Sequence, residues 1–192
     1  MKVTLCKKTH RIIDFRPQAN WYWLFDHNRA ILTLNMGDRV IDIVYKPEML
    51  ILKFDQPVFF TIEDVANYMD LFEGPALGDY WPALRSQIIL HALVANQFHK
   101  PIMPKNWLFE SSVGEQPRVH KGDHIILKSS AIKEAKKYFV LDNDENFILC
   151  MLIEKSHGLT FNRNFVQFQI VKVTYDKIFA TKADCNTLSQ YV

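Results

Sequence analysis

WYWLFDHNRAILTLNMGDRVIDIVY, residues 21–45, is the stretch that decides the fold of the first half of the chain. Three runs of aromatic and β-branched residues alternate in it with the polar clusters DHNR (26–29) and NMGD (35–38). Runs of this composition form strands, and clusters of Asn, Asp and Gly form the turns between them. The stretch therefore predicts a meander of three antiparallel strands, with the third run (39–45) largely buried.

The first run also predicts which rings enter the core. Side chains two positions apart on a strand share a face, so Trp21 and Trp23 point one way and Tyr22 the other. If both tryptophans are core residues, Tyr22 is expected to be the most exposed of the three rings.

Two helices are expected after the meander. Thr61-Ile62-Glu63-Asp64 has the form of a capping box, so a helix should begin there and end at Gly74-Pro75. A second helix is expected over residues 82–98, where apolar residues fill most of the circumference and predict burial on more than one side. The predicted apolar face of the first helix consists of Ile62, Val65, Ala66, Met69 and Phe72.

The composition of the chain changes after residue 110. Residues 111–123 are rich in Ser, Gly, Pro and charge, which is typical of a boundary or a long surface loop. Strand-like runs follow, among them FILCMLIE (147–154) and FVQFQIVKV (165–173). We therefore predict an α+β protein. Its N-terminal α/β domain (residues 1–110) has antiparallel strands and two main helices, and its C-terminal domain (111–192) is β-rich and barrel-like.

Composition restricts the class of protein. The 192 residues carry 23 Lys+Arg against 21 Asp+Glu, so a net charge of +2 gives no overall field that favours nucleic acid or anionic lipid. No apolar run reaches membrane-spanning length and no signal-peptide core is visible, which predicts a cytoplasmic protein without membrane insertion. The three cysteines lie far apart without CxxC spacing, so neither a disulfide scaffold nor a zinc site is expected.

The sequence lacks the usual signatures of an active site. It has no Gly-rich phosphate loop, no GxSxG and no HExxH, and it contains only 6 Gly. These features predict a non-enzymatic protein with no cofactor and no bound metal. The alternative is a small cytosolic hydrolase whose site is assembled from scattered residues such as Asp79, His91 and Cys150.

The segment HKPIMPKNWLF, residues 99–109, combines two prolines, two lysines and two large aromatic residues. The prolines predict a stiff, extended backbone, from which Lys100 and Lys105 project into solvent while Trp107 and Phe109 share a face. A rigid basic rim beside an aromatic side chain is typical of a protein interface. Two alternatives remain: an interdomain connection whose aromatics cap the core, or a nucleic-acid module that uses Lys100, Lys105 and Trp107.

Several motifs resemble the ZapC family of cell-division proteins. HALVANQFHKPIMPKNWLF (91–109) is similar to the central segment of that family, and NWYWLFD (20–26) is similar to its opening motif. FFTIED (59–64) and ENFILCMLIE (145–154) are weaker matches in the same order. The basic segment 1–16 and the chain from Tyr175 onward have no counterpart in the family pattern.

The resemblance implies a non-enzymatic, monomeric, two-domain protein that binds FtsZ. Such a protein bundles FtsZ filaments laterally, stabilises them at the midcell Z-ring and lowers their GTPase turnover. Family knowledge places FtsZ contact on residues that correspond here to Leu32, Lys100 and Lys105. Phe60 corresponds to an aromatic residue that lines an apolar pocket, and Trp107 completes the predicted binding site as the aromatic of the lysine segment.

Overall fold

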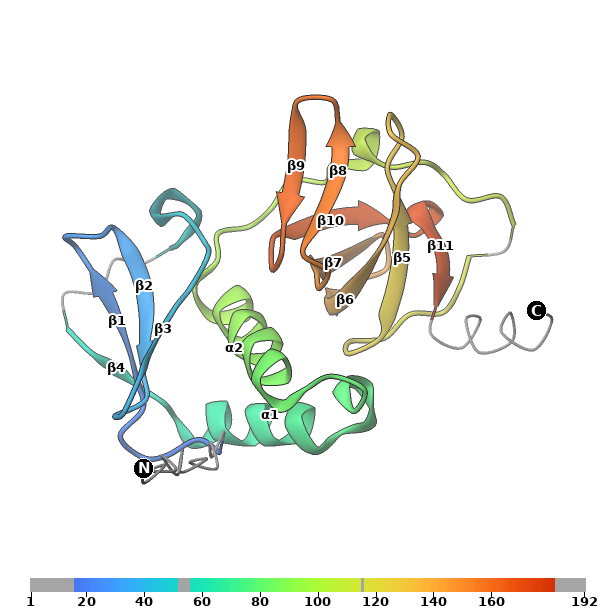
Figure 1. Cartoon of the computed structure of the whole chain (residues 1–192). Helices are drawn as coiled ribbons and strands as arrows, with labels where there is room; N and C mark the ends of the chain where they lie inside the picture. The colour runs from blue at the N-terminus through green and yellow to red at the C-terminus, as the bar shows by residue number, and fades with distance from the viewer. Residues whose placement is uncertain (1–15, 52–55, 115, 182–192) are drawn as a thin grey trace, which may run out of the picture.

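The computed structural model describes residues 16–51, 56–114 and 116–181 of the chain. In the first half, an antiparallel sheet is followed by helices α1 (Ile62–Glu73) and α2 (Pro82–Phe98) (Figure 1). The order across this sheet is β3-β2-β1-β4. Its strands are β1 (Tyr22–Asp26), β2 (Ile31–Asn35), β3 (Val40–Asp42) and β4 (Val58–Phe59).

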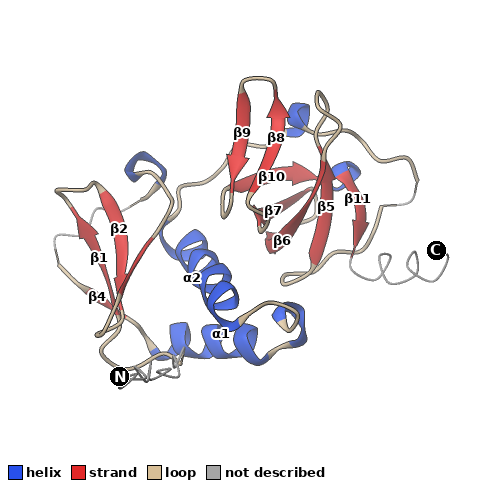
Figure 2. Ribbon diagram, in the orientation of Figure 1, coloured by secondary structure: helices blue, strands red, loops and turns tan. Residues whose placement is uncertain are grey.

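The second half is a curled, half-barrel sheet with a projecting hairpin (Figure 2). The order of the sheet is β10-β7-β6-β5-β11, and β8 and β9 form a two-stranded sheet of their own. These strands are β5 (His124–Lys128), β6 (Ala135–Asn143), β7 (Phe147–Leu152), β8 (Ser156–Thr160), β9 (Arg163–Val166), β10 (Ile170–Thr174) and β11 (Ile178–Thr181). The chain is therefore an α+β protein, as predicted. Short 3₁₀ turns are η1 (Pro47–Met49), η2 (Pro75–Leu77), η3 (Asn106–Leu108) and η4 (Tyr175–Lys177).

The predicted meander is confirmed, because β1 pairs with β2 and β2 with β3, both antiparallel. The expectation of a largely buried third strand is wrong. β3 lies at the edge of the sheet, so only one of its faces is covered, and Ile43 and Tyr45 continue that buried face while Val40 and Asp42 are exposed. The Asp42 carboxylate pairs with the guanidinium of Arg29 at this edge.

The strand assignment of the aromatic run is confirmed by the burial of its rings. Trp21 and Trp23 are fully buried, whereas Tyr22 is partly exposed and packs on Phe59 with the ring centroids 5.5 Å apart. Phe60 fits between the two tryptophans, 5.5 Å from Trp21 and 5.4 Å from Trp23. These aromatic contacts anchor β1 to the start of α1.

The capping box predicted for α1 is present. The Asp64 amide donates to the Thr61 hydroxyl (3.1 Å), and the Thr61 amide donates to the Asp64 carboxylate (2.8 Å). The predicted apolar face is wrong in part, because Ile62 is 91% exposed and Ala66 is exposed. Tyr68 takes the buried position instead. Its hydroxyl is hydrogen-bonded to Ser86 Oγ of α2 (2.6 Å), so this partner sets which face of α1 turns inward.

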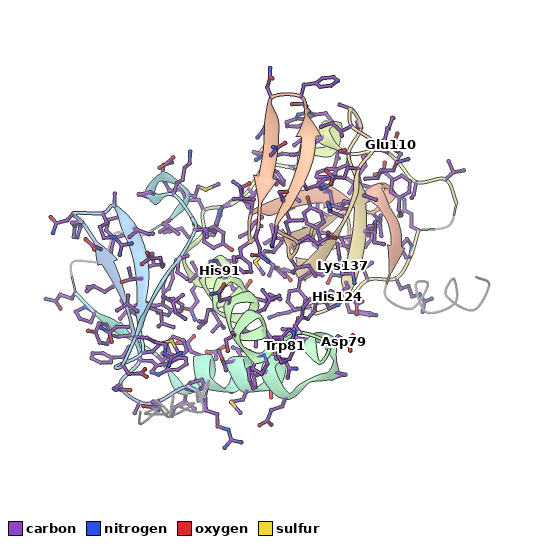
Figure 3. All side chains as sticks on the ribbon, in the orientation of Figure 1. Asp79, Trp81, His91, Glu110, His124 and Lys137 are labelled. Carbon is purple, nitrogen blue, oxygen red and sulfur yellow. The ribbon has the colours of Figure 1, made fainter. Side chains whose placement is uncertain are left out.

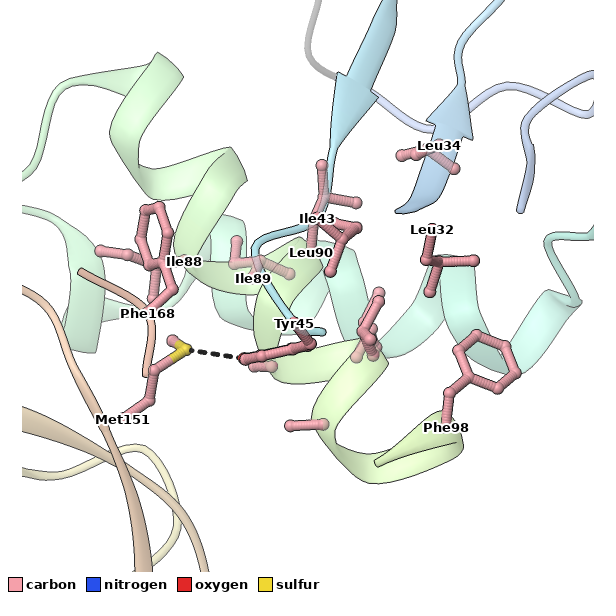
Figure 4. Packing of buried hydrophobic residues seen from close by; sticks show 14 of the residues in the cluster. Leu32, Leu34, Ile43, Tyr45, Ile88, Ile89, Leu90, Phe98, Met151 and Phe168 are labelled. Carbon is pink, nitrogen blue, oxygen red and sulfur yellow. Dashed lines mark hydrogen bonds between the residues drawn. The ribbon is translucent and has the colours of Figure 1, made fainter. Parts of the chain in front are cut away.

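Helix α2 is buried on more than one side, as expected, and it joins the two halves of the molecule. Figure 3 shows side chains filling the space on both sides of α2, on which His91 is labelled. One hydrophobic cluster contains Leu32, Leu34 and Ile88 from the first half together with Met151 and Phe168 from the second (Figure 4). The Tyr45 hydroxyl donates to the His91 carbonyl (3.2 Å) and lies 3.5 Å from Met151 Sδ. The two halves therefore share one core, and a second core lies within the half-barrel.

One predicted strand is interrupted at this junction. The run 165–173 was expected to be continuous, but it divides between β9 and β10. Phe168 lies in the break with φ of +68°, a conformation that is rare for a bulky residue, and its ring stacks on His91 with the centroids 4.1 Å apart. The contact with α2 thus takes precedence over continuous pairing along the sheet edge.

Candidate partner-binding site

Residues 99–109, which we call the strap, begin against the first half of the molecule. The Lys100 amide donates to the Met49 carbonyl (2.7 Å), the Ile51 amide donates to the Phe98 carbonyl (2.7 Å), and His99 forms an isolated antiparallel bridge with Leu50. The prolines that follow hold an extended backbone after α2. The start of the strap is therefore fixed to the turn before the helices.

The end of the strap is fixed to the second half. Pro104 forms a parallel bridge with Lys172 of β10, and the Lys105 amide donates to the Lys172 carbonyl (2.9 Å). Asn106 Oδ1 accepts the amide hydrogen of Thr174 (3.0 Å). The strap therefore covers part of the β10 edge and connects the two halves through backbone hydrogen bonds at both ends.

The two predicted lysines lie in different surroundings. Lys100 is exposed, and its ammonium group donates to the Glu48 carbonyl (2.8 Å) of the first half. Lys105 is half-buried, with Nζ 5.8 Å from the centre of the Phe165 ring of β9. Burial, followed by the nearby positive charge of Arg163, lowers the Lys105 pKa. The prediction that both lysines project into solvent is confirmed for Lys100, which is exposed, and is wrong for Lys105.

The prediction that Trp107 and Phe109 share a face is wrong. Asn106–Leu108 forms a 3₁₀ turn, in which the residue period is about three instead of two. Trp107 is therefore 68% exposed, whereas Phe109 is 2% exposed and packs on Tyr138 and His157 of the half-barrel core. Trp107 remains available to a partner, and so does Met103, which is 78% exposed.

Leu32 and Phe60 lie inside the first half. Leu32 is fully buried on β2 opposite Phe25, so its side chain holds the sheet and has no exposed surface to offer a partner. Phe60 is half-buried between Trp21 and Trp23. Leu32 can therefore act on a partner only through the position of the sheet, whereas Phe60 keeps some exposed surface.

A cleft that sequence reasoning missed runs between the helices and the half-barrel. Its volume is about 710 Å³, and Phe59, the neighbour of Phe60, is among its lining residues. An adjoining cavity of about 220 Å³ extends it. Both cavities are lined by Asn67, Leu93, Asn96, Lys121 and Leu141. No motif in the sequence indicated this cleft, whose lining residues come from segments far apart in the chain.

The residues of the hydrolase alternative are not assembled into a site. His91 Nδ1 is hydrogen-bonded to the Gln87 carbonyl (2.7 Å), and Nε2 accepts the amide hydrogen of Val44 (3.4 Å). Its ring therefore has no free nitrogen for Asp79, which is exposed in the loop before α2 (Figure 3). Cys150 is buried in the half-barrel core, where burial raises the pKa of its thiol, so it is a poor nucleophile.

Across 16–51, 56–114 and 116–181, no three His, Cys, Asp or Glu side chains come together in a way that would hold a metal ion. No helix in that part of the chain is long and apolar enough to cross a membrane.

The sequence matches two family models that together span most of the chain. Residues 14–100 match the model "Cell-division protein ZapC, N-terminal" and residues 101–184 match "Cell-division protein ZapC, C-terminal". The second match continues to residue 184, so similarity to the family extends beyond Tyr175, where we expected it to end. The segment before residue 14 has no match in these models.

Curated relatives named "Cell division protein ZapC" are similar over nearly their whole length. The relative from Proteus mirabilis is 30% identical over 165 residues, which cover 85% of this chain and 88% of the relative. The relative from Photobacterium profundum is 26% identical over 172 residues, which cover 88% of this chain and 94% of the relative. The relative from Vibrio cholerae serotype O1 is 26% identical over 178 residues, which cover 90% of this chain and 93% of the relative.

Proposed function

Because the chain belongs to the ZapC family of cell-division proteins, we propose that it is a non-enzymatic protein that binds FtsZ. It acts in the cytoplasm as a monomer and is recruited to the Z-ring at midcell. It bundles FtsZ filaments laterally, which stabilises them and lowers their GTPase turnover. It has no nucleic-acid partner.

The strap is the observation that carries this proposal. It is fixed by backbone hydrogen bonds at both ends, yet it leaves Lys100, Met103 and Trp107 exposed. A rigid segment loses little conformational entropy when it binds, and aromatic side chains, methionine and cations in rigid segments make effective interface contacts. The strap therefore has the features of a preformed binding surface.

The five predicted residues act in two ways in this proposal. Lys100, Lys105 and Trp107 contact FtsZ from the strap. Leu32 and Phe60 hold the sheet and the start of α1, against which the first half of the strap is fixed. Substitution of either residue is expected to reduce binding only to the extent that it disturbs the fold.

Sedimentation tests the proposal. Purified FtsZ is polymerised with GTP, and the chain is added before high-speed centrifugation, with phosphate release followed in parallel. We expect the chain to pellet with filaments and to remain in the supernatant without them, while GTP turnover falls. A chain that stays in the supernatant at every FtsZ concentration would contradict the proposal.

A further inference from the structure

The β8–β9 hairpin carries an exposed aromatic residue that the fold does not require. Phe161 is 95% exposed at the two-residue turn between Thr160 and Arg163. The other turn residue, Asn162, is a common turn former, and neither residue has a positive φ, so the geometry of the turn does not require a phenylalanine. Figure 1 shows this tip pointing away from the helices.

The base of the hairpin, in contrast, is firmly attached. Leu159 and Phe165 belong to the half-barrel core, and His157 is hydrogen-bonded on both sides, to the Tyr138 hydroxyl (2.8 Å) and to the Glu134 carbonyl (2.9 Å). The tip is thus held in place by buried residues only a few positions away. A rigid support of this kind lowers the entropic cost of presenting an exposed ring to a partner.

The strap brings further interface residues to the same hairpin. Lys105 lies over the Phe165 ring, and Phe109 packs on His157 with ring centroids 6.0 Å apart. Trp107, between these two anchors, is exposed. Lys105, Trp107, Phe161 and Arg163, which we call the hairpin surface, therefore come from two segments that are packed against each other.

The charges of the hairpin surface are not neutralised within the described part of the molecule. Arg163 is exposed and close enough to Lys105 to lower its pKa, and neither residue forms an ion pair with a carboxylate among the described residues. Two neighbouring cations beside two exposed aromatic rings are complementary to an acidic surface that also presents apolar side chains.

We propose that the hairpin surface is a second contact site, separate from the Lys100 end of the strap, which binds an acidic, partly apolar patch on a neighbouring FtsZ filament. This inference rests on the proposed function and adds to it, because a monomer that crosslinks two filaments needs two contact surfaces. The Lys100 end belongs to the first half of the molecule, and the hairpin surface belongs to the second. The shared core keeps the two sites at a constant separation.

The test separates binding from bundling. Phe161→Ala removes the exposed ring and leaves Lys105 and Arg163 unchanged. Val113→Ala is the matched control, because it truncates another exposed apolar side chain, in the 111–123 loop. High-speed pelleting reports binding to single filaments, and light scattering with low-speed pelleting reports bundles. A melting curve accompanies each variant.

We expect the hairpin variant to bind filaments within about twofold of wild type while the bundling signal falls about tenfold, the loss that truncation of one interface anchor commonly produces. The control variant should match wild type in both assays. Unchanged bundling by the hairpin variant would overturn the inference while leaving FtsZ binding intact. Equal loss of binding and bundling in a folded variant would also overturn it, because one surface would then serve both.

Two other outcomes are distinguishable. A wild-type chain that fails to pellet with FtsZ contradicts the proposed function, and it therefore also contradicts the proposal of a second site. Lysine, arginine and exposed rings also suit single-stranded nucleic acid, so an oligonucleotide gel shift is run with wild type and the hairpin variant. A shift that is lost in the variant would overturn the assignment of a protein partner to this surface.

Discussion

Charge reversal on the strap, Lys100→Asp with Lys105→Asp, tests the proposed binding surface in the greatest detail. The fold should tolerate it. Lys100 gives up one hydrogen bond to the Glu48 carbonyl, which is worth about 1 kcal/mol. Lys105 forms no ion pair among the described residues, and burial already disfavours its charge. We therefore expect the melting temperature to fall by no more than about 4 °C.

The effect on binding should be much larger. A pair of opposite charges about 4 Å apart in a solvated interface contributes about 1 kcal/mol, and reversal replaces that attraction with a similar repulsion. Two lysines with partial salt screening therefore give a loss of about 2 to 4 kcal/mol, which is a decrease in affinity of about 30-fold or more. The carboxylate introduced by Lys105→Asp would also attract Arg163 and so reduce the positive charge of the same region.

The assay is FtsZ affinity at about 50 mM and about 300 mM salt, where screening differs strongly. Wild-type binding should weaken as salt rises, and the variant should be weak at both concentrations. Lys137→Asp with Lys155→Asp is the control, because it also reverses two lysine charges, at exposed positions elsewhere on the second half. A folded strap variant that binds as tightly as wild type would refute the reasoning.

Three further predictions concern single residues. Leu32→Ala should lower the free energy of unfolding by about 3 kcal/mol, because Leu32 is fully buried. The affinity of this variant for FtsZ should be unchanged at temperatures where the variant stays folded. A weaker affinity at those temperatures would show direct contact. Burial lowers the His91 pKa from 6.5 to about 4, so the unfolded state binds more protons between these pH values and stability should fall by about 2 kcal/mol from pH 7 to pH 5. Denaturant unfolding at several pH values measures this pH dependence of stability. If the His91→Gln variant shows the same pH dependence as wild type, His91 is not its source. Cys150 should resist alkylation at pH 8 in the native protein and react on unfolding, because it is buried and its thiol pKa is raised. Peptide mass mapping identifies the cysteine that is labelled. Rapid labelling of Cys150 in the native protein would contradict its place in the core.

Local patterns predicted the elements of the first half well. The strands of the meander and the capping box at Thr61 depend on residues close together in the sequence. The buried face of α1 could not be predicted in the same way. It depends on the hydrogen bond between Tyr68 and Ser86, which forms only when α1 and α2 pack together.

Sequence reasoning described part of the strap correctly and missed its turn. The prolines correctly indicated an extended segment, whereas the separate exposure of Trp107 was not predicted. The turn at Asn106 depends on a hydrogen bond to Thr174, 68 residues later in the chain, so residue spacing alone gave the wrong face for Phe109. The different surroundings of Lys100 and Lys105 likewise arise because the strap crosses from one half of the molecule to the other.

The central claim, that the strap is the surface on which FtsZ binds, is tested most directly by amide hydrogen exchange. The exchange of the chain is measured alone and with FtsZ filaments assembled in GTP, and peptides covering residues 99–109 are compared with those from the rest of the chain. We predict slower exchange in the strap peptides when filaments are present, and no such protection in the Lys100→Asp, Lys105→Asp variant. Exchange that is unchanged in the strap, while the chain is bound to filaments, would contradict the account.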